Sequence, residues 1–134
     1  MTNRAYTPFK VLLLKGDIDL ENDTIKAILI DTADYTFDAN HDFYNDANAG
    51  AVGTPQTLAN KTFTGGVFNA DDVTFPTVTG DPCEAVIVYK DTGVAGTSPL
   101  IAFIDNAVGL PVTPNGGNIT VQWNASGILR LADA

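Results

Sequence analysis

The side chains that could support nucleophilic catalysis are few in this chain. It holds one histidine, His41, and two serines, Ser98 and Ser126. Neither serine stands in the Gly-x-Ser-x-Gly pattern of a nucleophile elbow. The single cysteine, Cys83, has no histidine nearby in the sequence, so we expect an unreactive buried thiol and no internal disulfide. These residues predict that the protein is not an enzyme; a Ser–His–Asp site assembled only in space is the weaker alternative.

A second group of chemically capable side chains is the acidic run of residues 17–23, which reads DIDLEND. Hard cations such as Ca²⁺ bind spaced carboxylates of this kind. The EF-hand pattern nevertheless fails, because Asn22 replaces the required glycine and Ile28 replaces the bidentate glutamate. In an extended segment the acids would share one face, while Ile18 and Leu20 would share the other. We therefore predict a half-buried edge there, with no metal and no other cofactor.

Four aromatic residues gather in the long segment of residues 32–60, which has little regular pattern: Tyr35, Phe37, Phe43 and Tyr44. Two interpretations stay open. The rings could pin this loop to the body of the protein, or they could form an exposed platform for a sugar or a protein partner.

The composition indicates strands joined by turns. The chain of 134 residues contains fourteen Asp but two Glu, with sixteen Thr and eleven Val. Asp favours turns, whereas the β-branched residues suit a pleated sheet. A formal charge of −9 disfavours nucleic acid as a partner. No stretch approaches the roughly 18 consecutive apolar residues of a membrane-spanning helix, and the first residues lack the apolar core of a secretory signal, so we expect no membrane partner.

Hydrophobic patterning predicts six or seven strands. Glu84–Lys90 is apolar on both faces and is expected to be central, with Pro99–Ile104 as its antiparallel partner. Pro76 places Val73–Val78 at a sheet edge. The other expected strands are Thr24–Asp31, Lys61–Phe68, Ile119–Trp123 and Gly127–Leu131.

Two segments are open to a helix. Phe9–Leu14 fits a helical turn or a strand, and Asn40–Ala47 could be a short helix. The predicted fold is all-β: an antiparallel β-sandwich with one long irregular loop and at most one or two short helices. A small barrel is the alternative.

Charge is distributed unevenly along the chain. Residues 1–15 contain three basic and no acidic residues, whereas residues 16–134 contain four basic and sixteen acidic residues. We therefore predict an N-terminal arm, residues 1–10, and a single β-sandwich domain, residues 11–134. The arm is either a frayed terminus or a segment that docks on a partner, and deleting residues 1–9 is expected to leave the fold intact.

Five sequence stretches carry a resemblance to a known group of proteins, one of which is VTGD at 78–81. The other four are TGGVFNADDVTF at 64–75, EAVIVYKDTG at 84–93, SPLIAFID at 98–105 and GLPVTPNGGNITVQW at 109–123. With residues 16–38, this series resembles small structural proteins of tailed bacteriophages and is similar to head decoration, or cement, proteins. The resemblance covers about four-fifths of the chain.

The resemblance implies a virion structural protein that is made in the host bacterial cytoplasm and binds the outer surface of the capsid. Its partners would be the major capsid protein and other copies of itself, as a dimer or a trimer. The group offers no catalytic motif. The candidate contact residues, from the arm and the aromatic loop, are Arg4, Tyr6, Phe9, Lys10, Tyr35, Phe43 and Tyr44.

Two alternative functions remain at this point. A tail, neck or fibre component of the virion would differ from a decoration protein in copy number. A carbohydrate-binding sandwich for host adhesion would require Tyr35, Phe43, Tyr44 or Trp123 to be exposed together.

Overall fold

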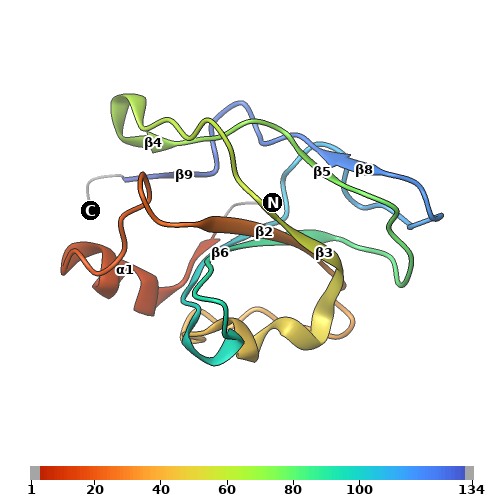
Figure 1. Ribbon diagram of the computed structural model, residues 1–134, viewed down its shortest axis with the longest axis horizontal. Coiled ribbons are helices and arrows are strands. Elements are labelled where there is room, and N and C mark those ends of the chain that lie inside the picture. The colour runs from red at the N-terminus through yellow and green to blue at the C-terminus, as the bar shows by residue number, and fades with distance from the viewer. Residues whose placement is uncertain (1–3, 132–134) are drawn as a thin grey trace.

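A five-stranded antiparallel sheet lies in the middle of the molecule (Figure 1). The structure is a computed structural model that describes residues 4–131. In spatial order the sheet contains β1 (Arg4–Ala5), β7 (Leu100–Ile104), β6 (Ala85–Lys90), β2 (Ile25–Ile30) and β3 (Ala51–Thr57). The prediction that Glu84–Lys90 is a central strand with Pro99–Ile104 as its antiparallel partner is confirmed.

The three inner strands are buried almost throughout, which explains why their sequences do not alternate between polar and apolar residues. β6 reads AVIVYK and β7 reads LIAFI, and both are buried over nearly their whole length. Strands covered on both faces need apolar side chains at every position. Val88 of β6 lies in register with Ala27 of β2 and Ala102 of β7, so two small side chains flank it within the sheet.

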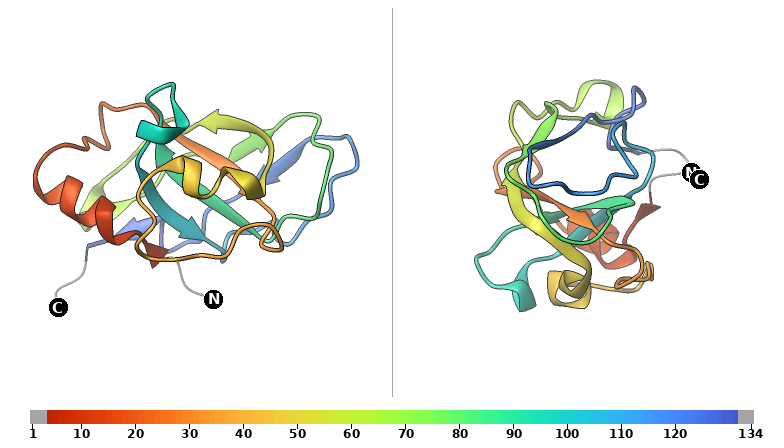
Figure 2. Two further views of the ribbon diagram at one scale, coloured as in Figure 1. Left: turned by 90° about the horizontal axis from the view of Figure 1, so that it is seen from below. Right: turned by 90° about the vertical axis from the view of Figure 1, so that its right-hand side faces the viewer.

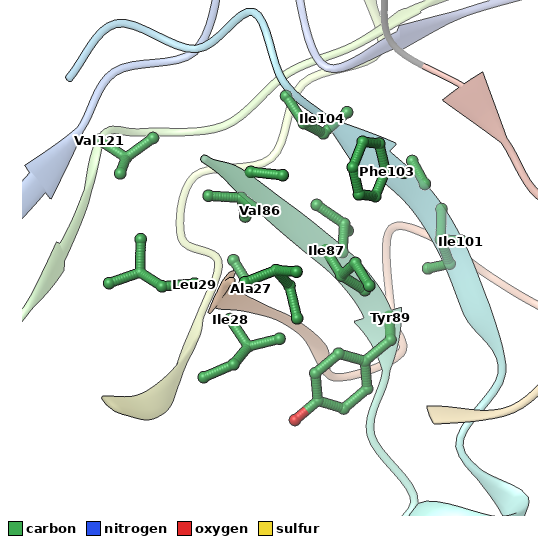
Figure 3. Packing of buried hydrophobic residues seen from close by; sticks show 14 of the residues in the cluster. Ala27, Ile28, Leu29, Val86, Ile87, Tyr89, Ile101, Phe103, Ile104 and Val121 are labelled. Atoms are coloured by element: carbon green, nitrogen blue, oxygen red, sulfur yellow. The ribbon is translucent and has the colours of Figure 1, made fainter. Parts of the chain in front are cut away.

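Two small antiparallel sheets lie over one face of the large sheet (Figures 1 and 2). One pairs β4 (Val67–Phe68) with β9 (Leu129–Arg130), and the other pairs β5 (Val73–Phe75) with β8 (Ile119–Val121). Figure 3 shows Val121 of β8 in the same apolar cluster as Leu29 and Val86 of the large sheet. Val73–Val78 was expected at a sheet edge. In agreement, β5 pairs with only one strand, β8, among the described residues.

The opposite face is covered by the segments around residues 43–50 and 91–98, with α1 (Thr7–Leu14) at one end of the molecule (Figure 2). Single turns of 3₁₀ helix form η1 (Tyr44–Asp46), η2 (Asn48–Gly50) and η4 (Ala95–Thr97), and a further turn, η3 (Thr64–Gly66), precedes β4. Phe9–Leu14 is thus helical, and the short helix expected near Asn40–Ala47 corresponds to η1. The regular structure of residues 4–131 is mostly antiparallel sheet, with one α-helix. The chain is therefore all-β, as predicted.

Residues 4–10 belong to the body of the protein, which corrects the predicted boundary between arm and domain at residue 10. β1 pairs with β7 through Arg4 and Ala5. Tyr6 is 0% exposed and Phe9 is 3% exposed. Both side chains are part of the core, so deleting residues 1–9 would remove core packing and should destabilise the fold. Residues 1–3 of the predicted arm lie outside the described residues.

Replacing Val88 with Asp tests the central position of β6. Val88 is fully buried, and an unpaired charge there should cost about 3–5 kcal/mol of unfolding free energy. Circular dichroism during heating and urea unfolding would measure the loss. Thr57→Asp, at an exposed position of β3, is the control that should keep near-normal stability. A Val88→Asp protein that melts like the wild type would contradict the strand assignment.

Candidate interaction surface

Helix α1 presents apolar side chains outward as well as inward. Pro8 in the first turn favours helix initiation, and Phe9 anchors the helix in the core. Val11 and Leu14, three residues apart and therefore neighbours on the helix surface, are 51% and 87% exposed. A helix that only covers a core carries polar residues on its outer face. The outward apolar residues of α1 therefore mark it as a candidate interaction surface.

Two hollows flank this helix. The first, which we call the α1–loop groove, measures about 380 Å³ and is lined by Thr7, Pro8, Val11, Leu12, Asn40, Asp42 and Phe43. The second measures about 540 Å³ and is lined by Leu13, Gly16, Ile18, Asp19, Leu20, Glu21 and Phe63. Apolar residues of α1 thus contribute to both hollows, and acidic residues of the neighbouring loops also line them.

Backbone hydrogen bonds fix the two walls of the α1–loop groove to each other and to the sheet. The Thr7 amide, at the start of α1, donates to the Ala39 carbonyl over 2.8 Å. On the loop side, the Tyr44 amide donates to the Ser98 carbonyl, and the Leu100 amide donates to the Asp42 carbonyl. These backbone bonds fix the relative positions of α1, the loop and the sheet around the groove.

A chain of buried hydroxyl groups anchors the same loop from within. The hydroxyls of Tyr6 and Tyr35 share a hydrogen bond of 2.8 Å, and the Tyr35 hydroxyl lies 2.8 Å from His41 Nδ1. Burial raises the pKa of both tyrosines, so both remain neutral hydroxyls at physiological pH. Gly50 lies so close that a Cβ there would meet the Tyr35 Cβ at 2.7 Å. The buried position of Tyr35 therefore supports the interpretation in which the aromatic rings pin the loop to the body of the protein.

Two further aromatic contacts complete this anchoring. The Arg4 guanidinium lies 4.2 Å from the centre of the Phe37 ring and 4.9 Å from that of Phe103. Tyr44 stacks on Tyr89 at a centroid distance of 4.3 Å, and burial raises the pKa of Tyr44 to about 12. Cation–π and stacking contacts of this kind add to the apolar packing.

The structure separates the predicted contact residues into three groups by their exposure. Tyr6, Phe9 and Tyr35 are buried, so their side chains are not available to a partner. Arg4 and Lys10 are exposed, whereas Phe43 and Tyr44 are half-buried. Phe43 lines the α1–loop groove.

Two of the four rings that the carbohydrate hypothesis named are buried, and a third is covered by another ring. Tyr35 and Trp123 are buried, and Tyr44 presents its ring to Tyr89. The Trp123 indole N–H donates to the Asp71 carbonyl, which holds that ring in the body.

The sequence interpretation missed the outward residues of α1, Val11 and Leu14. The signal that could have found them is the run of four apolar residues from Val11 to Leu14. In a helix, four consecutive apolar residues cannot all face one core, because successive side chains point about 100° apart.

Two of the residues considered for nucleophilic catalysis, Ser98 and His41, have structural partners. Ser98 is buried, and its hydroxyl donates to the Val94 carbonyl and accepts from the Thr92 amide. His41 bonds to Tyr35 rather than to a serine. Its ring therefore serves the loop anchor in this arrangement.

The acidic run of residues 17–23 uses its carboxylates within its own turn and in ion pairs with nearby lysines. Asp19 accepts from the amides of Glu21 and Asn22, and the Asp23 carboxylate accepts from the Asp19 amide. Lys90 makes an ion pair with Asp23 at 3.1 Å. Ile18 is buried, as the alternating pattern predicted.

A separate carboxylate cluster joins residues that are distant in sequence. One oxygen each from Asp31, Asp34 and Asp81 lies within 4.8 Å of the others. Repulsion from Asp31 raises the pKa of Asp34, with smaller contributions from desolvation and Asp81. Such an all-oxygen donor set could hold a hard cation, and a proton on Asp34 relieves the same repulsion.

No protein-family model matches the chain, and no curated protein matches it. None of the helices in residues 4–131 is long and apolar enough to cross a membrane.

Replacing Tyr35 with Phe tests the hydroxyl chain. The change removes the central hydroxyl and leaves the buried Tyr6 hydroxyl without its partner, which should cost about 1–3 kcal/mol of unfolding free energy. Urea unfolding would measure it. Tyr44→Phe is the matched control, because the Tyr44 hydroxyl makes no hydrogen bond to the described residues. Equal losses in the two variants would refute a stabilising role for the chain.

The buried Cys83 thiol predicts a pH dependence of stability. Burial, with smaller contributions from Glu84, Asp31 and Asp81, raises the pKa of Cys83 to about 11. In the unfolded chain this pKa is about 8.5. Because the raised pKa belongs to the folded state, the contribution to stability is complete below about pH 8.5 and is lost as the pH rises toward 11.

The measurement compares urea unfolding of the wild type and Cys83→Ala at pH 7 and pH 10.5. We expect the wild type to lose more stability than the variant across this interval. Tyrosine ionisation affects both proteins alike and therefore cancels in the comparison. Equal losses would show that the thiol does not ionise differently in the two states.

Proposed function

We propose that the protein is a virion structural protein that attaches as a decoration, or cement, protein to the outside of a capsid lattice. The observation that carries this proposal is the outward apolar surface of α1, where Val11 and Leu14 are both exposed and lie three residues apart on the same helix. The resemblance of residues 16–38 and 64–123 to phage structural proteins suggests that the partner of this surface is another virion protein. The structural partners found for His41 and Ser98 also favour a binding role over a catalytic one.

The proposal includes the arrangement of the sheets as a β-sandwich. In a β-sandwich reading, the five-stranded sheet would be one layer, and the β4–β9 and β5–β8 pairs would together be the other. A body of this kind would keep α1 in a fixed orientation while many copies bind a repeating surface.

Such a protein would stabilise a capsid by binding the assembled state in preference to free subunits. Binding of this kind shifts the assembly equilibrium by mass action. If copies also contact one another as dimers or trimers, many weak contacts give high avidity. The partners would therefore be the major capsid protein and other copies of this chain.

The acidic composition supports an outer position. At a formal charge of −9, the protein would be repelled by packaged nucleic acid. A tail, neck or fibre component remains the second candidate, because the same apolar surface could attach to any virion part.

Copy number and heat stability of purified particles test this proposal. In particles of the virus whose genome encodes the chain, we expect on the order of hundreds of copies, because a repeated lattice offers equivalent sites throughout. Quantitative mass spectrometry would count the copies, and cryo-electron microscopy would locate them. Particles without the protein should release their genome at a lower temperature, and adding the protein back should restore the difference.

Two results would change the proposal. Far fewer copies, at a vertex or along the tail, would move the protein to the neck or tail. Absence from purified particles would overturn a virion role altogether.

A further inference from the structure

We propose that the α1–loop groove accepts an apolar side chain from a cationic segment of the partner protein, while aspartates of the adjacent loop bind the Lys or Arg residues that flank it. The identification of that partner as a virion protein rests on the proposed function above. The groove's preference for a cationic apolar segment is argued from the structure alone and does not depend on that function.

The apolar residues that line the groove supply the apolar part of this recognition. Pro8, Val11 and Leu12 line the groove from α1, and Phe43 lines it from the loop. Its volume of about 380 Å³ falls in the range of small ligand sites and suits one or two apolar side chains.

The loop wall supplies the electrostatic part. From residue 27 to residue 60 the chain contains no Lys or Arg, yet this stretch holds Asp31, Asp34, Asp38, Asp42 and Asp46. In residues 4–131 the ion pairs involve other acids, namely Asp17, Asp23, Asp91 and Asp105. The loop therefore carries negative charge that no lysine or arginine of the described chain neutralises.

Three of these aspartates belong to the groove or to its immediate wall. Asp42 lines the groove, and its amide donates to the Asp46 carboxylate over 3.1 Å. The Asp38 carboxylate accepts from the amide of Asn40, another lining residue. The Asp42 backbone amide holds the pKa of Asp46 below its usual range, so that carboxylate stays charged. On the helix side, Lys15 is paired with Asp17, and the exposed Lys10 is not among the residues that line the groove.

Charge argues against a second copy of this chain as the occupant. Each copy carries a formal charge of −9, and its cations largely serve internal partners. A cationic segment of another protein would instead meet attraction at long range and apolar contact at short range. The bonds from α1 to Ala39 and from the loop to β7 fix the groove before binding, which lowers the entropy cost of association.

Defined peptides test the chemistry of the groove without any virion component. The probes are the seven-residue peptides KRLFLRK, EDLFLDE and KRSGSRK, titrated into the ¹⁵N-labelled full chain. We expect KRLFLRK to bind at least about tenfold more tightly than either of the others and to weaken with added salt. Its amide shifts should centre on α1 and residues 38–46. Equal binding by the three peptides, shifts elsewhere, or no binding would overturn the proposal.

Two pairs of variants separate the apolar lining from the charged wall. Val11→Lys should reduce KRLFLRK affinity about tenfold or more, whereas Val108→Lys, at a similarly exposed valine (59%), should not. Asp38→Asn with Asp42→Asn should weaken binding and its salt dependence. Asp72→Asn with Glu21→Gln removes the same charge at exposed positions outside the groove and should have little effect. Equal effects within either pair would refute the assignment.

A particle-binding arm distinguishes failure of this inference from failure of the proposed function. If wild-type protein and Val11→Lys bind particles equally well, the groove is not the docking site but the virion role stands. If KRLFLRK binds the groove but the protein is absent from particles, the groove chemistry stands and the virion role fails. Self-association that Val11→Lys abolishes, measured by sedimentation, would assign the groove to a second copy and overturn the proposal.

Discussion

The burial of both faces of three adjacent strands is the constraint on which the rest of the structure depends. β2, β6 and β7 present apolar side chains above and below the sheet, so each face must be covered by other parts of the chain. The β4–β9 and β5–β8 pairs cover one face. On the other face the cover is mostly irregular chain with short helical turns. The candidate interaction surface forms where this irregular chain meets α1.

An irregular cover must be held by specific contacts, because it lacks a continuous backbone ladder. The N-terminal residues supply many of them. Tyr6 reaches Tyr35 through a shared hydrogen bond, Arg4 covers Phe37, and the first amide of α1 donates to Ala39. α1 and the loop of residues 31–50 are thus interdependent, which is why the groove between them is a defined feature rather than a gap between mobile parts.

Much of the large sheet could be predicted from the sequence, because long apolar β-branched runs have few other uses. Glu84–Lys90 and Pro99–Ile104 were recognisable for this reason. β3 was not, because Gly53 and Pro55 are typical of loops, and its strand pairing depends on the neighbouring β2. The carboxylate cluster of Asp31, Asp34 and Asp81 was hidden for a different reason: it forms only when the end of β2 and the approach to β6 meet in the fold.

The N-terminal segment shows how a local charge pattern can conceal a structural role. Its three cations and lack of acids suggested an arm for a partner, whereas the structure places Tyr6 and Phe9 in the core. The loop on the other side of the groove has the opposite charge pattern, with aspartates and no lysine or arginine. There the loop turns Tyr35 inward to hold the fold and leaves Asp38 and Asp42 outward, where they are free of ion pairs within the described chain. Stability and recognition therefore depend on different side chains of the same loop, so that substitutions can alter either one separately.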